Sequence, residues 1–375
     1  MKICFWGNIA GALKGSTDGG GELQVALLAK AVAKAGHEVV IVDFQTDEEF
    51  ITEDGIKILR IKGWDAGIRF LRTFTHRLPQ IYLSLKAQRA DVYYCRIRDY
   101  RHILAFWAAR KAKAKFILGM ASDLDAMTFL KRVKYHNVAY YSGVWGLLNS
   151  ILIEIVYPWL LHKADIVLVQ HEGQKSILEK RGIKSRVFPN LIELSQFPFS
   201  SNPVQKDFIY VGWLSKRKGF RKFFEVIRKC PSQTFKVIGP PCDKVGFAFY
   251  KELQLFKNVT LYGQLSHSDV LYHMVNSKAL ISTSQMEGFP NVFIEAWSCG
   301  IPVLSLYVDP GNVIRDNGLG TVARGNVDEL LKAIKGYKSS FEFSNKARKY
   351  IESTHGLSEE KIKEIDSLFK ELLGR

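Results

Sequence analysis

Residues 284–303 read SQMEGFPNVFIEAWSCGIPV, and their pattern indicates a loop and a helix between two strands. Short apolar runs typical of buried parallel strands occur at 279–282 and from 303 onward. Pro290 suits the first turn of a helix, because its missing N–H would have no partner there, and Gly300 suits the position just after the helix end. The stretch therefore predicts one strand–loop–helix–strand unit of an α/β sheet.

The loop of this unit carries groups that suit a sugar nucleotide. Gly288 lies near the predicted helix start, where free backbone N–H groups and the helix dipole favour an anion such as a diphosphate. Glu287 precedes the helix and Glu295 lies about one and a half turns inside it, so the two carboxylates can reach different parts of one ligand. Carboxylates accept hydrogen bonds and suit sugar hydroxyls. The spacing alone leaves open that Glu287 caps the helix and Glu295 is a solvated helix residue.

The stretch resembles the donor-binding motif of the retaining GT-B glycosyltransferases of family GT4. Two glutamates separated by seven residues, a Gly-Phe-Pro insert and a Gly-x-Pro-Val sequence all coincide. In that family the first glutamate contacts the transferred sugar and the second the nucleotide ribose, and these roles fall on Glu287 and Glu295. The resemblance also assigns four neighbours to donor binding: Gly288, Phe289, Pro290 and Asn291.

A second loop, at 212–219, lies between a predicted strand and a predicted helix, at the sheet edge where ligands of such folds bind. In GT4 enzymes this loop reads Gly-Arg-Leu-x-x-x-Lys-Gly, and its two cations neutralise the donor diphosphate. Lys218 matches the lysine, but Trp213 stands at the arginine position. Either Arg217 or Lys216 supplies the second cation, or the diphosphate is held less tightly. The resemblance adds Gly212, Gly239 and Leu265 as donor contacts.

The chain as a whole alternates apolar runs with helical segments. Strands are predicted at 2–6, 39–42, 91–94, 116–118, 164–169, 185–188, 207–212, 235–239, 259–263, 279–282 and from 303. This alternation predicts an α/β protein with open parallel sheets, and with the resemblance a GT-B fold of two Rossmann-like, doubly wound domains facing across a cleft. The expected domains are 1–188, which would bind the acceptor, and 189–355, which would bind the donor. A terminal helix in 356–375 is expected to return toward the first domain.

The first domain holds two further candidates. Gly20 lies in a triplet of glycines at a predicted helix start, which suits a phosphate. Many GT4 enzymes have a sugar-contacting histidine in the loop after a first-domain strand, and here Asp123 stands in that loop. We expect Asp123 to orient the sugar or handle a proton, or else to cap a helix. Asp123 and Asp125 also match a D-x-D metal motif in letters, which would indicate a GT-A site instead.

The net charge of +16 is concentrated in part of the first domain. Residues 57–115 hold fifteen Lys or Arg and three acids, interleaved with aromatic residues: Trp64, Phe70, Phe74, Tyr82 and Trp107. Such a segment could face an anionic membrane, a polyanion or a nucleic acid, or could simply be solvated. Residues 144–161 are apolar enough to raise the alternative of a membrane span, which Glu154 disfavours.

Cysteine usage and the N-terminus indicate the compartment. The five cysteines form no C-x-x-C pair, and their odd number argues for a reducing environment. Residues 1–7 are too short in their apolar part for a signal peptide. A cytoplasmic protein is expected, with peripheral contact to the inner face of the plasma membrane through residues 57–115.

The expected function is transfer of a hexose from a UDP- or GDP-sugar to a glycan or lipid-linked acceptor with retention of configuration, in cell-surface polysaccharide biosynthesis. Catalysis would rest on Glu287, Lys218 and Asp123, with no metal or other cofactor and no nucleic acid partner. Two alternatives remain: a sugar-nucleotide 2-epimerase on the same fold, and a polyanion- or nucleic-acid-binding protein.

Overall fold

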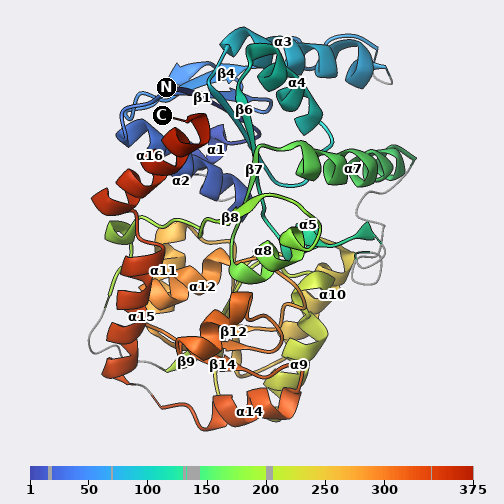
Figure 1. Cartoon of the computed structure of the whole chain (residues 1–375). Coiled ribbons are helices and arrows are strands. Elements are labelled where there is room, and N and C mark those ends of the chain that lie inside the picture. Colours follow the sequence, from blue (N-terminus) through green and yellow to red (C-terminus); the bar gives the residue numbers. More distant parts are fainter. Residues whose placement is uncertain are drawn as a thin grey trace. The chain divides into compact units, whose positions relative to one another are not determined.

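The computed structural model describes residues 1–15, 19–68, 71–129, 132, 144–199, 206–338 and 340–374. Contacts between residues divide the chain into two compact units (Figure 1). Unit 1 comprises Met1–Leu191 and Leu357–Arg375, and unit 2 comprises Ile192–Gly356. The chain thus passes between units close to the boundaries expected after residues 188 and 355.

Unit 1 is an α/β unit. Its strands are β1 (Lys2–Trp6), β2 (Glu38–Asp43), β3 (Phe50–Ile51), β4 (Lys57–Arg60), β5 (Val92–Arg96), β6 (Lys115–Gly119), β7 (Ile166–Val169) and β8 (Ser185–Val187). Its α-helices are α1 (Ala10–Leu13), α2 (Gly20–Lys34), α3 (Leu78–Gln88), α4 (His102–Ala112), α5 (Asp123–Ala126), α7 (Val144–Lys163), α8 (Glu172–Glu179) and α16 (Glu359–Leu373). A π-helical turn, η1 (Thr73–Arg77), precedes α3.

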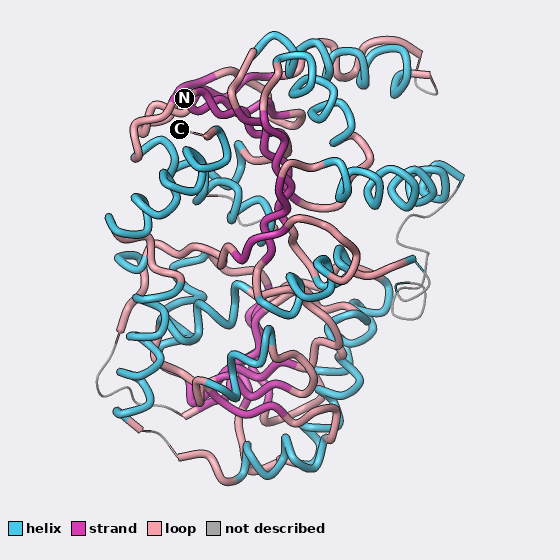
Figure 2. Tube along the Cα trace, in the orientation of Figure 1, coloured by secondary structure: helices cyan, strands magenta, loops and turns pink. Residues whose placement is uncertain are grey.

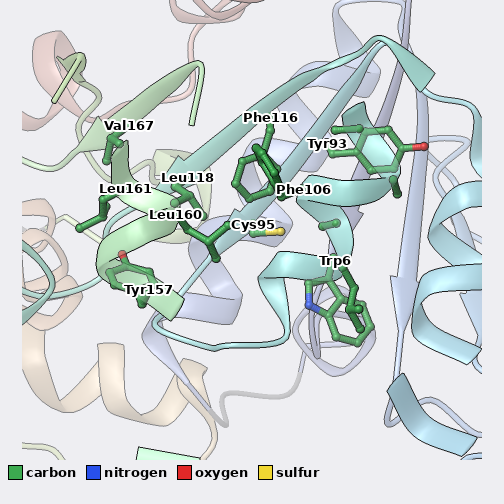
Figure 3. Close-up of a cluster of buried hydrophobic side chains, with 14 of the residues drawn as sticks. Trp6, Tyr93, Cys95, Phe106, Phe116, Leu118, Tyr157, Leu160, Leu161 and Val167 are labelled. Carbon is green, nitrogen blue, oxygen red and sulfur yellow. The ribbon is translucent and has the colours of Figure 1, made fainter. Parts of the chain in front are cut away.

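The strands of unit 1 form one sheet in the order β3-β4-β2-β1-β5-β6-β7-β8. Neighbouring strands are parallel, except that β3 is antiparallel to β4. Apolar side chains are buried on both faces, as parallel sheets require. On one face the buried cluster includes Trp6, Tyr93, Phe106 and Phe116 (Figure 3).

The opposite face of this sheet is covered in part by the C-terminal helix. Phe369 of α16 is fully buried in the same cluster as Phe5 of β1. At the surface of α16, Asp366 Oδ1 lies 2.9 Å from His37 Nε2. The last helix of the chain is therefore part of the core of unit 1.

Unit 2 is also an α/β unit. Its strands are β9 (Asp207–Val211), β10 (Phe235–Ile238), β11 (Val259–Gly263), β12 (Ser277–Ser282), β13 (Val303–Ser305) and β14 (Gly320–Val322). Its α-helices are α9 (Phe220–Lys229), α10 (Lys244–Leu253), α11 (His267–Val275), α12 (Asn291–Ser298), α13 (Val313–Asp316), α14 (Val327–Lys335) and α15 (Phe341–Thr354). Short 3₁₀ turns occur at η2 (Leu194–Gln196), η3 (Lys216–Lys218) and η4 (Pro310–Asn312).

The sheet of unit 2 is entirely parallel, in the order β11-β10-β9-β12-β13-β14 (Figure 2). The first strand, β9, lies inside the sheet, and the chain builds outward from it in both directions. Between β9 and β12 the loops at the carboxyl ends therefore diverge to opposite faces, which is where ligands of doubly wound sheets bind. The two loops singled out from the sequence, at 212–219 and 284–290, follow β9 and β12 respectively.

Two expectations about the first domain need correction. The elements β3, β4, η1 and α3 were not predicted. For β3 and β4 the reason is that these strands are very short and carry charged or exposed residues. Residues 57–115 do not form one surface, since β5 and β6 within this range are central strands.

The aromatic residues of the basic segment behave differently from one another. Trp64 stacks on Phe44 with ring centroids 5.3 Å apart, and Tyr82 packs against the buried cluster. Phe74 and Trp107 are exposed, and Phe70 lies outside the described residues. Among the described helices, α7 included, no segment is long and apolar enough to cross a membrane.

Candidate active site

The loop after β9 is fixed by close backbone packing against the loop after β12. Gly219 ends η3 with φ +70°, and a Cβ atom there would lie 2.0 Å from the carbonyl oxygen of Thr283. The hydroxyl of Thr283 donates to the carbonyl oxygen of Lys218 at 2.8 Å. Only glycine fits such an approach in this conformation. These contacts hold Lys218 at the carboxyl edge of the sheet.

The loop after β12 is fixed by α12. Phe293, Ile294 and Trp297 of this helix are buried, and the indole N–H of Trp297 donates to the carbonyl oxygen of Leu319 at 2.9 Å. The sequence predicted Pro290 in the first helical turn of α12. In the structure Pro290 is the N-cap, and the first helical residue is Asn291. The helix thus begins three residues after Gly288, which is buried.

Lys218 and Glu287 form an ion pair at this point, with Lys218 Nζ 2.6 Å from Glu287 Oε1. Their side chains are only 18% and 17% exposed. Burial alone would raise the pKa of Glu287, but the Lys218 ammonium group, aided by Arg217, outweighs burial and lowers it. The carboxylate is therefore held ionised beside a cation, in a pocket whose lining also includes Tyr210, Ser284 and Pro290.

Three glycines at the ends of neighbouring strands let the backbone of the following loops pack closely at this edge of the sheet. A Cβ atom on Gly239 would lie 2.1 Å from the carbonyl oxygen of Gly212, and one on Gly212 would lie 3.8 Å from Lys218 Cε. The amide of Gly239 donates to the carbonyl oxygen of Gly263 at 2.7 Å. The backbone at Gly212 thus lies next to the Lys218 side chain.

The other expected donor residues of unit 2 have different surroundings. The ring of Phe289 is buried against His355, with ring centroids 4.9 Å apart, so it supports the loop from the core side. Asn291 is the first residue of α12 and is partly buried. Leu265 packs against the buried cluster of unit 2 that contains Phe293 and Trp297. Trp213, at the position of the usual arginine, is 46% exposed.

Glu295 has a partner that the sequence did not indicate. His267, the first residue of α11, places Nε2 3.5 Å from Glu295 Oε1. Glu295 raises the pKa of His267, against the opposing effect of burial. The sequence marked residues 266–269 only as a helix start, which Ser266 does cap.

In unit 1, Asp123 belongs to a polar cluster. Asp123 Oδ1 accepts a hydrogen bond from Gln174 Nε2 at 2.9 Å and lies 2.9 Å from His171 Nε2. The Asp123 side chain is 32% exposed and that of His171 is 10% exposed. His171 follows β7, far along the chain, so the local sequence around Asp123 gave no sign of this imidazole.

The two alternative roles of Asp123 are not seen. Ser122, not Asp123, is the N-cap of α5, and it forms a capping box with Asp125. Asp125 Oδ2 accepts from the backbone amides of Ala121 and Ser122, so this carboxylate serves the N-terminus of α5. Among the residues that the structure describes, no cluster of three or more His, Cys, Asp or Glu could hold a metal ion.

Gly20 also lies in unit 1. It is the first residue of α2, whose N-cap is Gly19. A Cβ atom on the next residue, Gly21, would lie 2.7 Å from Ile97 Cδ1, so this glycine-rich turn packs closely on the loop after β5. Gly20 is thus at a helix N-terminus, as expected.

Comparisons with known proteins cover both units. The family model "Glycosyl transferases group 1" matches residues 192–354, and "Glycosyltransferase Family 4" matches residues 18–196. An uncharacterized glycosyltransferase of Methanocaldococcus jannaschii is 29% identical over 180 residues, and this match covers 43% of this chain and 44% of that protein. One subunit of the human phosphatidylinositol N-acetylglucosaminyltransferase is 22% identical over 90% of this chain and 69% of its own length.

Solved structures share the fold over the whole chain. Sucrose-phosphate synthase from Thermosynechococcus elongatus has a TM-score of 0.75 at 16% identity, covering 100% of both chains. HepE of Anabaena, solved with UDP, has a TM-score of 0.68 at 14% identity, also covering 100% of both. Together with the GT-B fold of its two parallel sheets, these matches show that the chain belongs to the GT4-type glycosyltransferases.

Proposed function

We propose that this protein transfers a hexose from a UDP- or GDP-sugar to a lipid-linked or glycan acceptor with retention of configuration, in cell-surface polysaccharide biosynthesis at the cytoplasmic face of the membrane. The observation that carries this proposal is the Lys218–Glu287 ion pair at the divergence of the unit 2 loops. The UDP complex of HepE supports a nucleotide donor. The name of the human relative supports a lipid acceptor.

In the proposed mechanism the donor diphosphate replaces Glu287 as the partner of Lys218. The ammonium group and the backbone N–H groups near Gly288 then stabilise the charge that develops on the departing diphosphate. A single preorganised donor of this kind lowers a barrier by about 3–4 kcal/mol. Arg217, which already influences Glu287 electrostatically, would supply the second cation. Because the chain provides these cations, the proposed reaction needs no metal ion.

Release from Lys218 leaves the Glu287 carboxylate to accept hydrogen bonds from hydroxyls of the transferred sugar. Glu295, inside α12, would bind the ribose hydroxyls, with His267 holding its carboxylate in place. Carboxylates suit this role because they only accept hydrogen bonds, while hydroxyls can donate. Each glutamate thus keeps the role that the resemblance implies.

Asp123 in unit 1 is assigned the orienting or proton-handling role, with His171 as its partner. A carboxylate that binds one ring nitrogen fixes the tautomer and the orientation of an imidazole. The loop around Asp123 contains no histidine, but His171, from a distant segment of the chain, contacts Asp123 and places an imidazole there. Under this assignment Asp123→Asn lowers turnover while the thermal unfolding midpoint stays nearly unchanged.

A thermal-shift screen with UDP-, GDP- and ADP-sugars tests the donor, since a ligand that binds the native state raises its apparent stability. Turnover is then followed with and without acceptor. Release of free nucleotide that depends on the acceptor supports transfer. Conversion of the donor to its epimer without any acceptor would indicate the 2-epimerase instead. Absence of any shift with all three donor classes would refute the proposal.

A further inference from the structure

The helix α7 exposes a stripe of large apolar side chains. The exposed fractions are 53% for Leu147, 44% for Leu148, 46% for Ile151, 66% for Ile155 and 40% for Trp159. At about 100° per residue these five positions fall within an arc of about 120°, and they extend over about 18 Å of helix. The buried residues of the same helix, among them Tyr157 and Leu160, lie on the opposite side. We call the five exposed residues the α7 stripe.

The α7 stripe carries no acidic residue. Glu154, the one acid in the sequence of α7, forms ion pairs with Arg98, at 2.6 Å, and with Arg132. Both arginines neutralise this carboxylate, which lies outside the arc of the stripe. The stripe itself would therefore not repel an anionic surface.

Cations and a second exposed indole lie on the neighbouring helix α4. Its Phe106 packs edge-on against Trp159, with ring centroids 5.1 Å apart, and its residue Trp107 is 49% exposed. Arg110, near the end of α4, donates to the carbonyl oxygen of Lys163 at the end of α7 and pairs with Asp165 at 2.9 Å. The next residue, Lys111, is exposed. Figure 1 shows α7 running outward from the unit 1 sheet, with its C-terminal end beside β7. The α7 stripe thus borders a helix that carries a further exposed indole and an exposed lysine.

From these observations we propose that the α7 stripe docks unit 1 in the interfacial layer of a bilayer containing anionic lipids. This deepens the proposed function, because it brings the chain to the surface where a lipid-linked acceptor resides. A helix with an apolar face, tryptophan at its flank and nearby cations is the type that lies in the plane of a membrane interface. A second copy of the chain is a poorer occupant, because each copy carries a net charge of +16.

The test uses the full chain, vesicles of phosphatidylcholine with phosphatidylglycerol, and a flotation assay. The double variant Ile151→Gln/Ile155→Gln removes two apolar side chains and keeps good helix formers. Its matched control, Leu255→Gln/Tyr272→Gln, removes two side chains of unit 2 that are 81% and 65% exposed. We expect the α7 variant to lose at least about tenfold in vesicle affinity, since each buried aliphatic side chain contributes substantially to partitioning. The control should stay within about twofold of the wild type.

Stabilisation by UDP or GDP is measured on the same samples. Unchanged stabilisation in the α7 variant shows that it is folded and that donor binding is separate from docking. Equal vesicle binding by the α7 variant and the wild type would overturn the inference. So would a wild-type dimer in sedimentation that the α7 variant converts to a monomer, which would assign the stripe to a second copy. Wild-type protein that binds the nucleotide but not vesicles refutes docking alone, whereas failure to bind any nucleotide refutes the proposed function.

Discussion

Replacing Lys218 by Met should weaken nucleotide binding by a predictable amount. The substitution keeps most of the aliphatic stem and removes the ammonium group that we assign to the donor diphosphate. A charge-assisted hydrogen bond of this kind contributes about 1.5–3 kcal/mol, which corresponds to a loss of about 10- to 150-fold in affinity. The effect should fall near the upper limit, because Glu287 would then face the diphosphate without a counter-charge.

The same substitution should destabilise the free protein at neutral pH. Removing one member of a fully buried ion pair costs about 3–5 kcal/mol, and we expect about 1–3 kcal/mol here because both side chains are 17–18% exposed. In the wild type the lowered pKa of Glu287 gives stability that is present above the unfolded-state pKa, about 4.3, and is lost as the pH falls through the folded-state pKa. In the variant the contribution of Lys218 is lost, so the pKa of Glu287 rises relative to that of the wild type. The stability difference should therefore shrink as the pH falls.

Calorimetric titration with UDP or GDP at pH 7.5 measures the affinity, and thermal unfolding from pH 7.5 to about pH 3 measures the stability across the titration of Glu287. Lys222→Met is the matched control, because Lys222 lies on α9 and pairs with Glu225 at the surface. It should leave both quantities nearly unchanged. A Lys218→Met protein that binds the nucleotide within about twofold of the wild type would refute the assignment of Lys218.

Three further outcomes follow from the site. Glu295→Gln should lower the pKa of His267, as measured by NMR, because the carboxylate that raises it is removed. In the wild type the raised pKa gives stability that is present below the unfolded-state pKa, about 6.5, and is lost as the pH rises through the folded-state pKa, so the variant's stability deficit should shrink over that rise. An unshifted His267 titration would contradict the pairing. Gly219→Ala should cost more than about 2 kcal/mol in thermal unfolding, because its Cβ would lie 2.0 Å from the Thr283 carbonyl oxygen, whereas Gly182→Ala, with a similar φ of +68° in open space, should cost less. Turnover should be unchanged in excess EDTA, and a loss that Mg²⁺ or Mn²⁺ restores would contradict the metal-free mechanism.

Much of the fold could be predicted because buried parallel strands appear in the sequence as short, continuous apolar runs. The run before Glu287 and the one after Gly300 are apolar for several residues, and the helix between them has its own start and stop signals. The glycosyltransferase family could be predicted because its motif is contiguous. By contrast, β3 and β4 are short, and their place in the sheet depends on pairing with each other and with β2.

The contacts within the site could not be predicted, because they join residues far apart in the sequence. Lys218 and Glu287 were both identified, yet nothing local indicated that they pair with each other. His171 and His267 were missed because each meets its carboxylate only after strands and helices have packed. The exposure of the α7 stripe was equally hidden, since an apolar helix does not reveal which side its own sheet covers.

The structure of the protein in complex with UDP or GDP tests the central claim most directly. The account predicts a diphosphate oxygen within hydrogen-bond distance of Lys218 Nζ, with the Glu287 carboxylate released from that lysine and turned to the sugar site. A nucleotide bound elsewhere, with the Lys218–Glu287 ion pair intact, would contradict it.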